Sequence, residues 1–201
     1  MKLFFLLFIT VIAQANQNPY ILTHDGLIDI RAQDKILEIG NETKSKLKVN
    51  LYVDIKENNG INPKEKRDIR KTLMKQKEQE MVKNLQKPYA VLTISIDQLY
   101  TNILMSDDLK DIIDRDDILD NYVIPLLASK DKNSLFAKVS ASMLNGYAAI
   151  ADTLAESKDI KLESSIGNAG KVSGTIWRVF MYTIVVLGLL AYTYAILRKR
   201  K

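Results

Sequence analysis

Residues 89–96 read YAVLTISI and decide the fold of this chain. A run of this kind, apolar or small at nearly every position, is typical of a strand that is buried on both faces and lies inside a sheet. Pro88 stands just before it and disfavours helical geometry in the preceding residue, so a helix upstream has to end here. Only Asp97 and Gln98 separate the run from residues 99–105, and this short link predicts a hairpin.

A second strand signal lies upstream, where residues 47–55 read LKVNLYVDI. Apolar and polar residues alternate, which is the pattern of a strand with one buried face. Between the two strands, residues 64–87 are highly charged and carry apolar residues at mostly helical spacing, which predicts a long solvated helix. A helix in this position forms a right-handed crossover between parallel strands. The sheet is therefore expected to be mixed and mainly parallel.

Further helices are predicted around these strands. Residues 33–46 are rich in helix formers, and Ser106 is a suitable N-cap for an acidic helix that follows the hairpin. Asp116 opens another helix, and Ser134 caps a long one with an apolar inward face. These elements predict one α/β domain over residues 16–155.

The order of these elements resembles the TPM domain family. The stretches that carry the resemblance are residues 47–53 (LKVNLYV), 89–94 (YAVLTI), 107–113 (DDLKDII) and 122–127 (YVIPLL). The resemblance covers about residues 25–155, and it implies a three-layer α/β sandwich that is exported and often tethered by one helix. Family members are described as acid phosphatases, as divalent-cation binders, or as helpers in the assembly or repair of membrane protein complexes. The chain departs from the family's turn sequences at residues 86–89 (QKPY) and 104–107 (LMSD).

The beginning of the chain has the pattern of a secretory signal peptide. Lys2 precedes an apolar run over residues 3–13, which is too short to cross a bilayer, and residues 13–15 read AQA, a pattern that signal peptidase recognises. We expect cleavage after Ala15, so that residues 1–15 are the signal peptide. The alternative is an uncleaved N-terminal anchor.

The other end has the pattern of a transmembrane helix. Residues 176–197 would span about 33 Å as a helix, enough for the hydrocarbon core of a membrane. Trp177 lies where an interfacial aromatic ring is favoured, and Arg198, Lys199, Arg200 and Lys201 form a basic tail that stays on the cytoplasmic side. Residues 156–175 lose periodicity and predict a flexible linker. We expect a single-pass protein of the bacterial inner membrane, with its domain in the periplasm and its C-terminus in the cytoplasm.

Composition excludes several kinds of site. The chain has no cysteine and one histidine, so thiolate chemistry, disulfides and histidine-based triads are not available. The net charge of +5 owes four positive charges to the basic tail, and it does not indicate nucleic acid as a partner of an exported domain.

A cluster of acidic residues is the candidate metal site. Six aspartates fall within residues 107–117. On one helix, positions separated by four and seven share a face, and carboxylate oxygens suit Ca²⁺ or Mg²⁺. We take Asp107, Asp108 and Asp111 as the candidate ligands. The alternative is that these carboxylates only stabilise helix N-termini on a solvated surface.

A basic segment is the candidate contact for a partner or for lipid. Residues 64–87 carry nine cations against four acids. We take Arg67, Arg70, Lys71 and Lys75 as candidate contacts with an acidic partner or with anionic lipid headgroups. The alternative is an ordinary solvated helix face.

These features favour a noncatalytic, membrane-anchored periplasmic module that binds or assists another envelope protein or membrane complex. Tethering raises the effective concentration towards membrane partners to about the millimolar range, so a weak binding surface is enough. The alternative is a weak acid phosphatase that depends on a divalent cation and uses residues 107–117.

Overall fold

The computed structural model describes residues 18–166, 182–187 and 189. The chain divides into two compact units, Met1–Ser165 and Ile166–Lys201. The first unit contains all the strands and long helices described below. In the second unit, residues 182–187 and 189 have helical backbone geometry.

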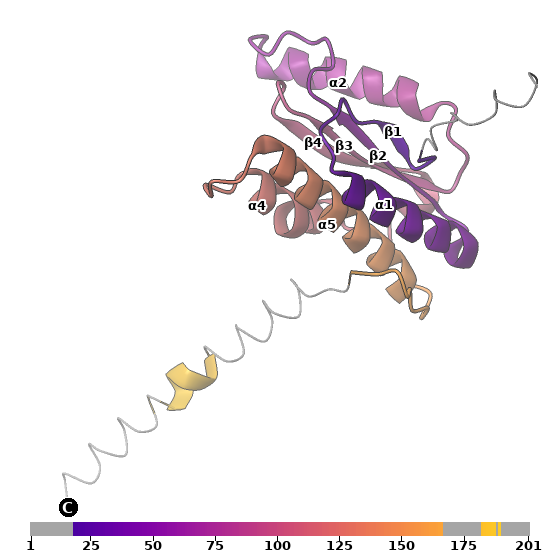
Figure 1. Ribbon diagram of the computed structural model, residues 1–201, viewed down its shortest axis with the longest axis vertical. Coiled ribbons are helices and arrows are strands. Elements are labelled where there is room, and N and C mark those ends of the chain that lie inside the picture. The colour runs from indigo at the N-terminus through magenta and orange to yellow at the C-terminus, as the bar shows by residue number, and fades with distance from the viewer. Residues whose placement is uncertain (1–17, 167–181, 188, 190–201) are drawn as a thin grey trace, which may run out of the picture. The chain divides into compact units, whose positions relative to one another are not determined.

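The centre of the first unit is a four-stranded sheet in the order β1-β2-β3-β4 (Figure 1). Its strands are β1 (Ile21–Thr23), β2 (Asn50–Lys56), β3 (Tyr89–Ser95) and β4 (Tyr100–Met105). The first three run parallel, and β4 pairs antiparallel with β3. The predicted α/β class with a mixed, mainly parallel sheet is therefore confirmed. All seven residues of β3 are buried, as its apolar sequence predicts.

Helices cover both faces of the sheet and make three layers. One face carries α2 (Arg67–Val82), and the other carries α1 (Ile30–Glu42) and α5 (Leu135–Glu156) (Figure 1). The chain between β4 and α5 forms short helical pieces: a 3₁₀ turn (Asp107–Leu109), α3 (Arg115–Ile118), the π-helical segment η3 (Leu119–Val123) and α4 (Ile124–Leu127). A further π-helical turn, Thr43–Leu47, extends α1.

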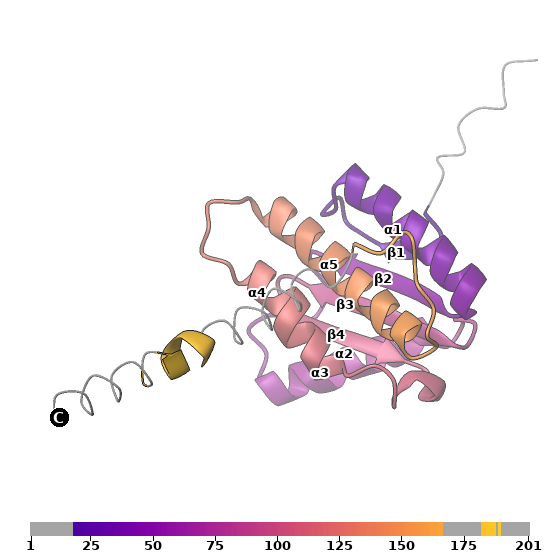
Figure 2. The ribbon, with the colours of Figure 1, turned by 90° about the horizontal axis from the view of Figure 1, so that it is seen from below.

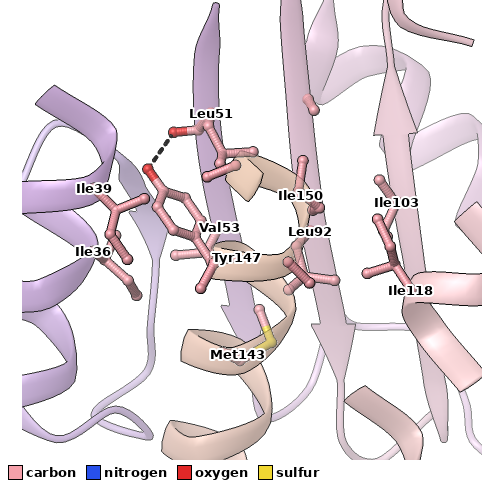
Figure 3. Packing of buried hydrophobic residues seen from close by; sticks show 14 of the residues in the cluster. Ile36, Ile39, Leu51, Val53, Leu92, Ile103, Ile118, Met143, Tyr147 and Ile150 are labelled. Atoms are coloured by element: carbon pink, nitrogen blue, oxygen red, sulfur yellow. Dashed lines mark hydrogen bonds between the residues drawn. The ribbon is translucent and has the colours of Figure 1, made fainter. Parts of the chain in front are cut away.

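The main core lies between the sheet and the helices α1 and α5. Apolar side chains of β2 and β3 such as Leu51, Val53 and Leu92 are fully buried there and meet Met143 and Tyr147 of α5 (Figure 3). The Tyr147 hydroxyl donates a hydrogen bond of 2.9 Å to the Leu51 carbonyl oxygen, so α5 is tied to β2 by a polar contact inside the core. Residues alternate in direction along each strand, so the opposite face, under α2, carries polar residues such as Asp54 and Thr93.

Two predictions about local structure are wrong. The strand predicted to start at Leu47 starts at Asn50, because Leu47 ends the π-helical turn and Lys48 has a left-handed backbone with φ of 61°. The acidic helix predicted after Ser106 is only a 3₁₀ turn. The Ser106 hydroxyl accepts a hydrogen bond of 3.1 Å from the Tyr89 backbone N–H, so it does not act as a helix cap.

The first residues of the predicted linker, 156–175, belong to the folded domain: Glu156 ends α5, and buried residues follow it. Leu162 and Ser164 are buried, and the Glu42 carboxylate accepts hydrogen bonds of 2.8 Å and 2.7 Å from the backbone N–H groups of Glu163 and Ser164. Glu163 and Ser164 are therefore tied to α1, while the backbone N–H groups of residues 157–160 donate to carbonyl oxygens at the end of α5. Residues 167–175 lie outside the described part of the chain.

The predictions about the two ends of the chain concern residues that the structure largely does not describe. The signal peptide over residues 1–15 lies outside the described part, as do Trp177, Arg198, Lys199, Arg200 and Lys201. Within residues 18–166, 182–187 and 189, no helix has the length and apolar character needed to cross a membrane.

Candidate binding site

A groove follows the outer edge of β4. Three neighbouring hollows lie along it. The middle hollow shares Tyr100, Thr101 and Ile124 with the hollow at the hairpin end. It shares Asn102 and Arg115 with the hollow at the far end of β4. Their volumes are about 310, 430 and 670 Å³ from the hairpin end to the far end of β4. We call this continuous depression the β4 groove.

The middle of the β4 groove lies between two helical layers. Lys71 and Lys75 of α2 form one wall, and Arg115 of α3 with Leu119 and Asp120 of η3 forms the other. Figures 1 and 2 show β4 between α2 on one side and the α3–α4 segment on the other. The three cations come from segments about forty residues apart in sequence, and only the fold brings them together.

Two of these cations form no close ion pair, although the charge of Lys75 acts to lower the pKa of the nearby Glu78 carboxyl. Within the part of the chain that the structure describes, neither Lys71 nor Lys75 forms an ion pair. Arg115 is paired, since its Nη2 lies 2.8 Å from an Asp116 carboxylate oxygen. The α2 wall of the groove is therefore positively charged, and the opposite wall is mixed because Asp116 and Asp120 also line it.

A buried carboxyl lies next to the groove. Glu78 of α2 is 5% exposed, and the Asn102 side chain donates to both of its oxygens at 3.1 and 3.2 Å. Burial raises the pKa of Glu78, and hydrogen bonds from Asn102 and Tyr100 offset part of this effect. Burial and the nearby Glu78 raise the pKa of Tyr100 as well. This arrangement holds the β4 side chains Tyr100 and Asn102 against α2.

The hairpin end of the groove is apolar. Leu99, Ile124, Leu127 and Leu135 line the hollow there. Leu99 is 91% exposed and has a positive φ of 47°, a conformation that is unfavourable for a leucine. The neighbouring Gln98 is 2% exposed and donates a hydrogen bond of 2.6 Å to the Ile61 carbonyl, so the turn buries a glutamine and leaves a leucine in solvent.

The structure separates the basic residues that the sequence singled out. Lys71 and Lys75 line the groove. Arg70 instead donates a hydrogen bond of 2.6 Å to the Pro63 carbonyl oxygen, and Arg67 is exposed at the start of α2. The sequence did not indicate Arg115, Tyr100 or Asn102, because nothing in their spacing shows that α2 and α3 flank the same strand.

The acidic candidates do not form a common helix face. Asp107 is paired with Lys110 at 2.6 Å, and the hydrogen bond from Lys110 lowers the pKa of Asp107. Asp108 is exposed, and Asp111 lines the far end of the groove. Within the described residues, no group of three or more acidic, histidine or cysteine side chains is placed to hold a metal ion.

No family model matches the chain, and no curated protein matches it. One solved structure that matches is the NMR structure of BA42 protein from the psychrophilic bacterium Bizionia argentinensis, at 11% identity and a TM-score of 0.42, covering 70% of this chain and 94% of that one. A likeness at this level does not indicate a function.

Proposed function

We propose that this chain is a membrane-anchored periplasmic module of the TPM type that binds or assists another envelope protein or membrane complex and catalyses no reaction. The observation that carries the proposal is the β4 groove, which joins a wall of unpaired lysines to an exposed apolar end. Exposed apolar surface beside charge is typical of sites where proteins bind one another.

The apolar end of the groove supports a binding function, because the exposed and strained Leu99 does not help the domain to fold. Leu99 is held in a strained conformation with its side chain in water. Strain of this kind costs on the order of 1–3 kcal/mol, and it persists where the surrounding structure or a function requires it. A partner that covers Leu99 would remove its apolar surface from water and offset that cost.

The anchor supports the location of the partner. Residues 176–197 and the basic tail that follows predict a single membrane span with the domain in the periplasm. Reporter fusions test this topology: a periplasm-dependent enzyme is expected to be active when fused after Thr175 and silent when fused after Lys201. Activity of both fusions or of the second alone would contradict it.

Chemical cross-linking in native membranes tests the binding function. The full chain is compared with the double variant Lys71→Glu, Lys75→Glu, which reverses the charge of the groove wall. If each lysine contributes about 1 kcal/mol to binding an acidic partner, the variant loses about 30-fold in affinity and the cross-linked adduct disappears. The matched control is Lys64→Glu with Lys83→Glu, which changes net charge equally at exposed positions on either side of the groove residues. Equal loss in both variants would contradict a site in the groove.

The alternative, an acid phosphatase, has its own test. Purified full-length protein is assayed with a chromogenic phosphomonoester at acid pH, with and without added Mg²⁺ or Ca²⁺. We expect no hydrolysis above background. Turnover that disappears in the variant Asp108→Asn, Asp111→Asn would replace the binding function with a catalytic one.

A further inference from the structure

β4 is an edge strand with one side open. It is the last strand in the sheet order, so its only strand neighbour in the described chain is β3. The Ser106 N–H bonds to the Tyr89 carbonyl at 3.0 Å, which makes Tyr89 and Ser106 a hydrogen-bonded pair. Because such pairs alternate along antiparallel strands, Leu104, Asn102 and Tyr100 also bond to β3. The backbone groups of Thr101, Ile103 and Met105 therefore point outward into the β4 groove.

The sequence of β4 has none of the usual features that protect an edge strand against pairing. Natural edge strands carry charged residues, proline or bulges, or are very short. β4 reads YTNILM over six residues, without charge or proline, and its register with β3 is continuous. The opposite edge differs, because β1 has only three residues and its register with β2 shifts between Ile21 and Thr23. Only one edge of the sheet is thus suited to accept a further strand.

The β4 groove has the shape that an added strand needs. It follows β4 along its length, which is about 20 Å for six residues, and it lies between α2 and the α3–η3 segment. A strand placed there would continue the sheet between the two helical layers. Its backbone would bond to Thr101, Ile103 and Met105, and its side chains would point alternately towards the two layers.

The walls of the groove define the chemistry of the occupant. On the α2 side, the unpaired Lys71 and Lys75 fit an acidic side chain. On the α4 and α5 side, Ile124, Leu127 and Leu135 fit a large apolar side chain. These two side chains point to opposite faces of the added strand, so they are separated by an odd number of positions.

We propose that an extended segment of a partner protein adds to the free edge of β4 as a fifth strand, with an acidic residue against Lys71 and Lys75 and an apolar residue at an odd separation against Ile124 and Leu135. This proposal rests on the proposed binding function and specifies its mode. The partner is recognised through its backbone and two side chains.

A displayed library of random ten-residue peptides, selected on the full chain in detergent micelles, tests the proposal. We expect enrichment of peptides with an acidic and a large apolar residue at an odd separation. Failure to enrich peptides, or enrichment without this pattern, overturns the proposal. So does a β4-dependent dimer of the chain itself, measured by analytical ultracentrifugation, because the occupant would then be a second copy.

Backbone pairing is tested with N-methylated versions of an enriched peptide. In an added strand, alternate backbone amides point towards β4 and the others point away from it. Methylation of the amides that bond to β4 is expected to weaken binding by about tenfold or more, and methylation of the other amides is expected to leave binding within about threefold. Binding that tolerates both sets overturns strand addition. The cross-linking test with the lysine variant does not depend on how the partner binds. A failure of strand addition in the peptide test would therefore leave the proposed binding function standing.

Variants of the chain complete the test. Thr101→Pro removes an outward N–H and keeps the backbone hydrogen-bonded pairs with β3, although it also removes the bond of 3.0 Å from the Thr101 hydroxyl to the Thr93 carbonyl oxygen. It is expected to abolish peptide binding. Lys71→Glu with Lys75→Glu is expected to weaken binding by about tenfold or more, and Lys64→Glu with Lys83→Glu to leave it within about twofold. Full binding by Thr101→Pro would overturn the proposal. The methylated peptides give the answer if that variant does not fold.

Discussion

Tyr147 offers a direct test of how α5 is held on the sheet. Its side chain is fully buried, and its hydroxyl donates to the Leu51 carbonyl at 2.9 Å (Figure 3). Tyr147→Phe keeps the ring and removes the donor, which leaves a buried carbonyl oxygen without this partner. We expect a loss of about 1–3 kcal/mol in the free energy of unfolding. For a domain of this size, each kcal/mol corresponds to about 2–4 °C in melting temperature.

Urea denaturation followed by circular dichroism measures this loss. The control is Tyr52→Phe, since Tyr52 is only half buried and donates no hydrogen bond within the described structure, and it is expected to change stability by less than about 0.5 kcal/mol. Wild-type stability of Tyr147→Phe would show that the hydroxyl does not hold α5 to β2. A loss well above about 3 kcal/mol would indicate that the ring itself moves and leaves a cavity.

Three further substitutions have outcomes that depend on charge or strain. Burial alone would raise the pKa of Glu42, but hydrogen bonds from Lys46, Ser164 and the backbone lower this pKa from 4.5 to about 2. The ionised Glu42 therefore stabilises the fold fully above about pH 4.5, and this stabilisation is lost as the pH falls towards 2. Glu42→Gln should therefore cost about 1–3 kcal/mol at pH 7 and little at pH 2, by urea titration at each pH. Glu78 behaves oppositely, because burial raises its pKa in the folded state. Its contribution to the free energy of unfolding is most favourable below pH 4.5 and declines as the pH rises. Glu78→Gln should therefore stabilise the protein at pH 7 by about 1 kcal/mol, and a destabilised variant would contradict this. Leu99→Gly should relieve the positive φ and raise stability by about 1 kcal/mol in thermal unfolding, while it weakens cross-linking to the partner; unchanged cross-linking would remove Leu99 from the binding surface.

Much of the fold follows from local patterns. The alternation of residues 47–55 and the apolar run of residues 89–96 predicted β2 and β3, and the two-residue link predicted the β3–β4 hairpin. Ser134 was predicted to cap the long helix, and its side chain accepts from the Ala137 N–H at 3.2 Å at the start of α5. These elements are long or have strong local signals, so periodicity is sufficient to find them.

The remaining features depend on contacts between distant segments. The three residues of β1 are too few for a periodic signal, and they are placed by pairing with β2. Ser106 looked like a helix cap, but its hydroxyl is used by the Tyr89 N–H seventeen residues away. The basic residues 67–75 were recognised as a group, yet only the packing of α2 and α3 around β4 shows that Lys71 and Lys75 share a groove with Arg115.

The central claim is that the β4 groove contacts a partner in the cell envelope. Site-specific photo-cross-linking tests this claim most directly. A photoreactive amino acid replaces Arg115, which lines the groove. As a control, it replaces Lys35 on α1, which is not among the residues that line the groove. Irradiation of native membranes should give one defined adduct from position 115 that is lost when Lys71 and Lys75 are changed to glutamate, and none from position 35. Equal adducts from both positions, or an adduct that survives the charge reversal, would contradict the claim.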